Sequence, residues 1–153
     1  MKINNADNFT HIIVKFLKAL GFENVKETDS SEEGIDITAQ KDKESYCFKC
    51  QYDMDAISEK KMDALCKVYE TGKYDKAVFV TNSSFISGAK KRGESAGVLL
   101  WDRNTVDRMA IGIAESLEDK VVETKKNPGI FIGAIAVAAV IIIALAVYFL
   151  IIR

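Results

Sequence analysis

The chain has 153 residues, of which 21 are basic and 22 are acidic, and its formal net charge is −1. This length suits one compact domain. The charge balance excludes a strongly basic, general nucleic-acid-binding protein, so any contact with nucleic acid needs a local basic surface. The three cysteines are an odd number, which argues against a disulfide framework in a cytoplasmic domain.

Apolar residues at helical spacing near the N-terminus predict a first helix, which begins near Asp7 or Asn8 and ends before Gly21. Residues 22–28 then predict a short edge strand. The segment 29–34 is polar and predicts a loop.

Two segments with alternating apolar and polar residues follow, at 35–40 and 46–52. This alternation is typical of strands with one buried face and one face toward solvent. The short polar stretch 41–45 joins them as a hairpin.

Helices and strands alternate in the next part of the chain. Residues 56–70 and 87–96 predict helices, and the continuous apolar run 77–80 predicts a strand covered on both faces. Residues 98–101 predict a last strand, after which Asn104 caps a final helix. The whole order predicts an α/β fold in which helices flank both faces of a mixed central sheet.

We therefore expect a domain over residues 1–118, a charged linker over 119–128 and a transmembrane helix over 129–152. The last segment has 24 residues and no charge, and about 20 apolar residues cross a bilayer. Lysines precede this span, whereas only Arg153 follows it, so the N-terminal domain is expected in the cytoplasm. The chain is thus expected to be a single-pass membrane protein that contacts lipid through its C-terminal helix.

The start of this apolar span contains the spacing Gly129-x-x-x-Gly133. Small residues at this spacing let two membrane helices approach closely. The same spacing is also common in membrane spans that do not associate. A homodimer and a single unassociated chain are therefore both open alternatives.

The hairpin brings together the residues with the clearest chemistry. Residues opposite each other in an antiparallel pair share a face, so Asp36 and Lys49 are expected side by side on the face away from the core. A carboxylate is a ligand for magnesium, and an ammonium group stabilises charge on a phosphate. The alternative for these two residues alone is a plain cross-strand salt bridge.

A wider pattern resembles the Mrr-type restriction endonuclease family, a branch of the PD-(D/E)xK nuclease fold. The resemblance covers roughly residues 9–109. It is carried by four groups of residues in order: Gly34-Ile35-Asp36, Phe48-Lys49, the strand 78–83 with Phe85 and Ala89 after it, and 98–102.

The resemblance implies a restriction-endonuclease-like fold and an enzyme that cuts DNA with Mg²⁺ or Mn²⁺. Asp36 matches the family's metal-binding acid, and Lys49 matches its catalytic lysine. Lys90, Lys91 and Arg92 on the predicted helix are then candidates for contacts with the DNA backbone. Without the family, these three are more simply a solvated helix face.

Two positions depart from the family pattern. Cys47 stands where the family has Gln or Glu, and Thr10 stands where it often has Glu. A thiol is a poor ligand for magnesium, and Glu32 or Glu33 in the preceding loop are candidates to compensate. The departures motivate a second hypothesis, a catalytically inactive nuclease fold that binds DNA or a protein partner at the membrane.

The remaining reactive side chains predict no further site. Cys47 and Cys50 have the spacing of zinc and redox sites, but positions three apart in a strand point to opposite faces. His11 is the single histidine and lies beside the apolar stripe of the first helix, so we expect it at the surface.

Overall fold

The computed structural model describes residues 5–28 and 34–126. The elements in chain order are α1 (Asn5–Ala19), β1 (Glu23–Glu27), β2 (Ile37–Lys41), β3 (Glu44–Gln51), α2 (Glu59–Tyr69), β4 (Lys76–Thr81), α3 (Ser87–Ala96), β5 (Leu99–Trp101) and α4 (Arg103–Lys126). The chain divides into two units after Val106, and the first unit holds the whole sheet. The predicted order of helices and strands is confirmed.

The five strands form one mixed sheet in the order β1-β2-β3-β4-β5. The first three strands are antiparallel, whereas β3 pairs with β4 and β4 pairs with β5 in parallel. A two-residue turn joins β2 to β3, and its residues Asp42 and Lys43 have φ angles of 53° and 70°. Positive φ at both positions is the requirement of the hairpin turn whose twist matches the strands. The parallel pairs need longer crossovers, which α2 and α3 provide.

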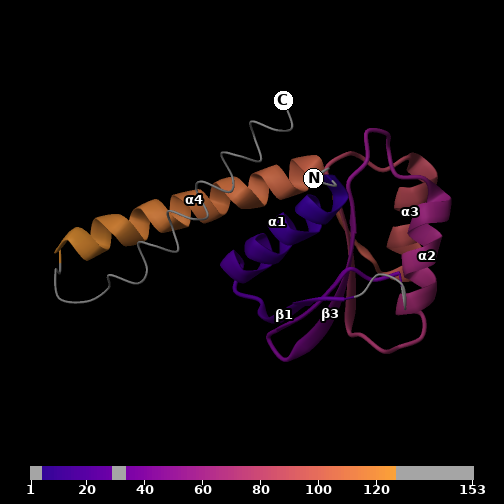
Figure 1. Cartoon of the computed structure of the whole chain (residues 1–153), viewed down its shortest axis with the longest axis horizontal. Coiled ribbons are helices and arrows are strands. Elements are labelled where there is room, and N and C mark those ends of the chain that lie inside the picture. The colour runs from indigo at the N-terminus through magenta and orange to yellow at the C-terminus, as the bar shows by residue number, and fades with distance from the viewer. Residues whose placement is uncertain (1–4, 29–33, 127–153) are drawn as a thin grey trace. The chain divides into compact units, whose positions relative to one another are not determined.

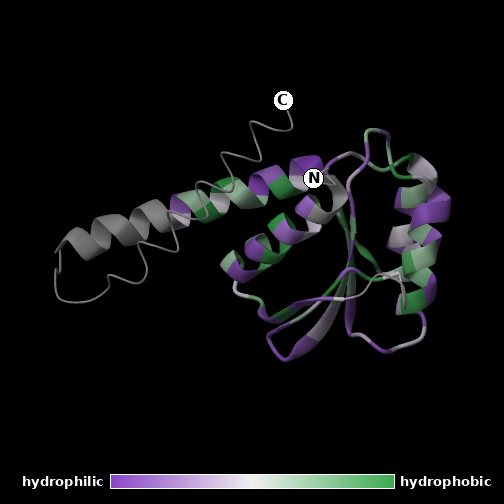
Figure 2. Ribbon diagram, viewed as in Figure 1, coloured by the Kyte–Doolittle hydropathy of each residue, from purple (hydrophilic) through white to green (hydrophobic). Residues whose placement is uncertain are grey.

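Helices cover both faces of this sheet. Helix α1 packs on one face against β1 and β3, and α2 and α3 lie beside each other on the opposite face against β4 and β5 (Figure 1). Each of these helices carries both hydrophobic and hydrophilic residues, as expected for helices with one buried side (Figure 2). The α1 stripe predicted from the sequence is buried, with Phe9, Ile13, Phe16 and Leu17 all at most 6% exposed.

An aromatic cluster occupies the sheet around β3. The ring of Phe48 lies 5.6 Å from that of Phe22, 6.1 Å from Tyr46 and 5.8 Å from Trp101, measured between centroids. Phe48 itself is fully buried. These contacts join the residue before β1 to β3 and β5, so Phe48 is a central packing residue.

Strand β3 is covered on both faces, which corrects the prediction of a half-buried strand. Cys47 is fully buried in a cluster with Met62 and Leu65 of α2. The alternation in the sequence assigns the residues of β3 to the correct faces. However, the face opposite Phe48 is covered by helices and does not face solvent. Ile35 belongs to the same cluster as Cys47, because the regular alternation of β2 begins only at Ile37.

Two details of the last helix differ from the prediction. Helix α4 begins at Arg103, and the carboxylate of Asp102 accepts a hydrogen bond from the Thr105 N–H at 2.9 Å, so Asp102 rather than Asn104 caps it. The helix continues to Lys126, so residues 119–126 of the expected linker are helical.

Among the residues that the structure describes, no helix is both long and apolar enough to cross a membrane. The expected span 129–152, with its Gly129-x-x-x-Gly133 spacing, lies outside those residues. The membrane anchor, the cytoplasmic location of the domain and the homodimer therefore stay predictions.

Replacing Phe48 with Ala tests the aromatic cluster. Removal of a fully buried ring should lower the free energy of unfolding by about 3–5 kcal/mol, because transfer free energy is lost and a cavity remains. Chemical denaturation followed by circular dichroism measures the change. The control is Met54→Ala, since Met54 is 86% exposed and its truncation should cost less than about 0.5 kcal/mol. Equal effects of the two substitutions would contradict the central role of Phe48.

Candidate active site

Asp36 and Lys49 are in direct contact at one edge of the sheet. The Lys49 Nζ lies 3.1 Å from Asp36 Oδ1, and the backbone N–H of Cys50 donates to Oδ2 at 2.6 Å. The hairpin register pairs Ile37 with Phe48, which places Asp36 opposite Lys49 one step further out. The predicted juxtaposition of this acid and this amine is confirmed.

The backbone of Asp36 is fixed between two strands. Its N–H donates to the Phe48 carbonyl at 2.9 Å, and its carbonyl accepts from the Thr28 N–H at 2.9 Å. Gly34, with φ of +67°, leads the chain into this position in a conformation that favours glycine. The main chain at Asp36 is therefore held on both sides, and the bond from the Cys50 N–H to Oδ2 orients the carboxylate.

The pair is partly shielded from water. The side chain of Asp36 is 11% exposed and that of Lys49 is 25% exposed, so the two charges are not as open to solvent as the sequence predicted. A carboxylate has about four acceptor sites and an ammonium has three donors. Within residues 5–28 and 34–126, two acceptor sites of Asp36 and two donors of Lys49 therefore have no hydrogen-bond partner.

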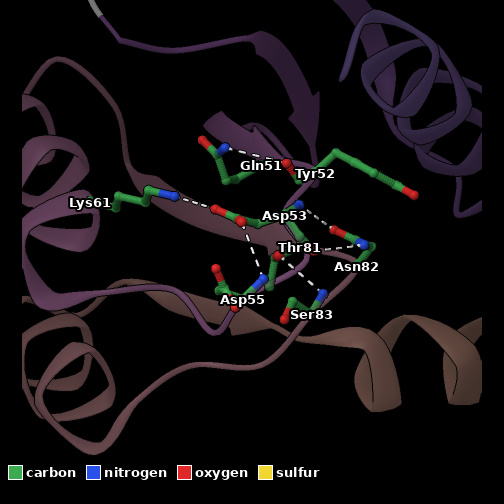
Figure 3. Close-up of polar contacts among 8 residues, drawn as sticks. All are labelled: Gln51, Tyr52, Asp53, Asp55, Lys61, Thr81, Asn82 and Ser83. Carbon is green, nitrogen blue, oxygen red and sulfur yellow. Dashed lines mark hydrogen bonds and ion pairs between the residues drawn. The ribbon is translucent and has the colours of Figure 1, made fainter. Parts of the chain in front are cut away.

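A second polar cluster lies where β3 and β4 end (Figure 3). The Asn82 carboxamide accepts from the Asp53 N–H at 2.7 Å and donates to the Asp53 carbonyl at 3.0 Å. Asn82 is only 8% exposed, so it satisfies both main-chain groups of Asp53 away from water. This two-bond clamp holds the segment after β3 against the segment after β4.

The carboxylate of Asp53 belongs to the same cluster. Lys61 of α2 forms an ion pair with it, and the Asp55 N–H donates to its Oδ1 at 3.2 Å (Figure 3). The hydrogen bond from Lys61 lowers the pKa of Asp53, so this carboxylate stays charged in neutral solution. This cluster was not predicted from the sequence. The pattern that indicates it is the presence of polar residues directly after a buried strand of a parallel pair.

Cys47 does not provide a metal ligand in this arrangement. Its thiol is fully buried beneath α2, on the same face of β3 as Lys49 but further into the domain. The other family position that departs from the pattern, Thr10, is half-buried on α1. Glu32 and Glu33 lie outside the described residues.

The basic residues of α3 separate into two kinds. Lys90 and Lys91 are exposed, as a contact with DNA requires. Arg92 instead forms ion pairs with Asp63 at 3.0 Å and Glu70 at 2.8 Å, and these bonds raise its pKa. Its guanidinium thus joins α3 to α2, and the contact of all three residues with DNA stays a prediction.

His11 lies at the surface and Cys50 in the core, as the sequence predicted, whereas the burial of Cys47 was not predicted. His11 is 59% exposed and pairs with Glu27 at 3.1 Å. The cysteines are all unpaired with one another and buried. Burial, followed by the charge of Asp36, holds the pKa of Cys50 well above its usual value, and burial also raises the pKa of Cys66. Neither thiol is suited to nucleophilic or redox chemistry.

The described residues offer one carboxylate for a metal ion at this position. No group of three or more His, Cys, Asp and Glu side chains in the described ranges is placed to hold a metal. Magnesium commonly binds through one or two carboxylates together with substrate phosphate and water. Among the described residues, Asp36 is the carboxylate beside Lys49 that suits this smaller requirement.

Comparison with known proteins identifies the family. The Mrr_cat model, described as restriction endonuclease, matches residues 2–110. The chain belongs to the restriction endonuclease family. The resemblance found in the sequence is thereby confirmed for the domain, and family membership supports a nuclease activity.

One solved structure shares the fold of this chain, and a second shows a weaker likeness. A protein of unknown function, AF1548, matches with a TM-score of 0.61 and 18% identity, over 90% of this chain and 95% of that one. The MspJI restriction endonuclease in complex with a 27-mer oligonucleotide matches with a TM-score of 0.46 and 15% identity, over 66% of this chain and 26% of that one. No curated protein matches the chain.

Replacing Asn82 with Ala tests the clamp between the two strand ends. The substitution leaves the N–H and the carbonyl of Asp53 without their partner, and should lower the free energy of unfolding by about 2 kcal/mol. Asn82→Asp keeps an acceptor and loses the donor. The free energy of unfolding of this variant should therefore lie between those of the wild type and of Asn82→Ala. Chemical denaturation measures both, with Asn8→Ala on the exposed side of α1 as the control. A loss no larger than that of the control would show that the clamp is dispensable.

The raised thiol pKa values predict slow modification of the native protein. At pH 8 the thiolate fractions of Cys50 and Cys66 should be below that of an ordinary cysteine, and burial further restricts access. A thiol-reactive chromogenic disulfide should therefore react slowly in buffer, and with all three cysteines at once in denaturant. Rapid reaction of one thiol in the native state would contradict the prediction.

Proposed function

We propose that this chain is a DNA endonuclease that hydrolyses phosphodiester bonds at the Asp36–Lys49 pair with the help of Mg²⁺ or Mn²⁺. The observation that carries the proposal is the 3.1 Å contact between the Lys49 ammonium and the Asp36 carboxylate at the sheet edge. Membership of the restriction endonuclease family supports the reaction class.

Each of the two residues has a distinct task. Asp36, oriented by the Cys50 N–H, would hold the divalent ion. When bound, such an ion would lower the pKa of a coordinated water and stabilise charge on the phosphate. Lys49 would donate to a phosphate oxygen and stabilise the negative charge that develops there. Because both groups are fixed by the hairpin, little reorganisation is needed when substrate binds.

The wider substrate contacts and the location belong to the same proposal. Lys90 and Lys91 contact the DNA backbone, which positions the duplex without reading its sequence. Arg92 stabilises the helix pair that presents them. Residues 129–152 tether the domain to the membrane on its cytoplasmic side, and pairing of two chains brings two active sites to the two DNA strands.

The cleavage assay uses the full-length chain purified in detergent, with supercoiled plasmid and Mg²⁺ or Mn²⁺. The wild-type chain should nick or linearise the plasmid. Asp36→Asn and Lys49→Met should each slow cleavage roughly 100-fold or more, since each removes a preorganised charge at the reacting phosphate. Lys26→Met, an exposed lysine on β1, is the control and should cleave at the wild-type rate. Undiminished cleavage by both site variants would overturn the assignment.

A second candidate function is a nuclease fold that binds DNA or a protein partner without cutting. The observation that favours it is Cys47, whose buried thiol replaces an amide or acid that the family pattern places there. This candidate predicts no binding of Mg²⁺ or Mn²⁺, combined with retained DNA binding that weakens steeply with salt. Cleavage that requires Asp36 would exclude it.

A further inference from the structure

Gln51 is the last residue of β3 and lies two positions beyond Lys49. Side chains two positions apart in a strand share a face, so Gln51 follows Lys49 toward the open edge of the sheet. Burial decreases along this face, from the fully buried Cys47 to the partly exposed Lys49 and Gln51. Gln51 is thus the next side chain on the face that carries the Asp36–Lys49 pair.

The contact of Lys49 with Asp36 brings this face of β3 to the carboxylate. The Lys49 Nζ lies 3.1 Å from Asp36 Oδ1, and Gln51 is two positions beyond Lys49 at the end of β3. Residues two positions apart in a strand are separated by about 6.6 Å, a separation that long side chains can bridge.

The orientation of the carboxamide favours this role. Its Nε2 donates to the Tyr52 carbonyl at 3.5 Å, so the donor end of the amide is turned toward the main chain (Figure 3). The opposite end, Oε1, accepts no hydrogen bond from any residue that the structure describes. An amide oxygen without a donor is a hard ligand of the kind that Mg²⁺ and Mn²⁺ prefer.

The other side chains nearby are less suitable. The thiol of Cys47 is buried and is a poor magnesium ligand. The carboxylate of Asp53 is held by Lys61 and by the Asp55 N–H, and that of Glu27 is paired with His11. On β3 beyond Lys49, Gln51 has a side-chain oxygen to which no described residue donates a hydrogen bond.

We propose that Gln51 supplies the second protein oxygen to the divalent cation held by Asp36. The proposal rests on the proposed function, because the cation is the one that the nuclease would use. In this proposal Gln51, two residues after Lys49, provides the metal-binding oxygen that Cys47, two residues before Lys49, cannot provide.

The test measures metal binding directly and involves no DNA cleavage. Mn²⁺ alone is titrated into the full-length chain in detergent, and free Mn²⁺ is followed by electron paramagnetic resonance. Gln51→Met has a similar size but no oxygen, and should weaken Mn²⁺ binding roughly tenfold or more. Gln51→Glu replaces a neutral oxygen with a charged one and should tighten binding, a gain that a misfolded variant would not show.

Matched controls use the same two substitutions at Gln40. This glutamine is exposed on β2, where it binds Asn24 at 2.6 Å, and Gln40→Met and Gln40→Glu should leave Mn²⁺ binding unchanged. Thermal unfolding of every variant checks that the fold is kept. Weaker binding by Gln51→Met together with tighter binding by Gln51→Glu supports the proposal.

Three results would overturn the proposal, and they are distinguishable. If the wild-type chain binds Mn²⁺ and Asp36→Asn does not, but both Gln51 variants bind like wild type, only the role of Gln51 fails. If Glu33→Gln weakens binding while the Gln51 variants do not, the loop supplies the second oxygen instead. If the wild-type chain binds no Mn²⁺, the metal-dependent function fails, and the role of Gln51 fails with it.

Discussion

The register of the β2–β3 hairpin is the constraint on which the candidate site depends. Pairing of Ile37 with Phe48 puts the apolar residues of both strands on the α1 face and leaves Asp36 opposite Lys49. A slip of one residue would exchange the two faces of a strand, so it would place Lys49 in the aromatic cluster and Phe48 at the polar edge. Burial of Phe48 and the two-residue turn between the strands together exclude that alternative.

Parallel pairing of β3 with β4 explains the second polar cluster, which contains Asp53 and Asn82. The carboxyl ends of parallel strands meet at the same edge, so the segment after β4 comes to lie against the segment after β3. Asn82 stabilises the contact between these two segments, because its carboxamide satisfies both main-chain groups of Asp53. These two hydrogen bonds therefore tie the end of β3 to the end of β4.

Periodicity in the sequence was enough for the order of the elements and for the contact of Asp36 with Lys49, because both follow from local rules of strand and helix geometry. What the sequence did not reveal depends on packing between distant segments. Burial of Cys47 requires α2 above β3, and the ion pairs of Arg92 require two residues of another helix. The Asn82 clamp likewise joins strand ends that are far apart in the chain.

The burial of Cys47 has a chemical consequence for the site. A Gln or Glu at that depth would need partners for its polar atoms, since an unsatisfied buried polar group costs about 1–3 kcal/mol. A cysteine behaves there as a small hydrophobic residue and needs none. On this face of β3, the change from apolar to polar side chains therefore occurs between Cys47 and Lys49. A polar residue at position 47 would place that change closer to the start of the strand. Among the described residues of this face, Lys49 and Gln51 are the polar side chains that follow Cys47 toward the end of β3, and Lys49 contacts Asp36 there.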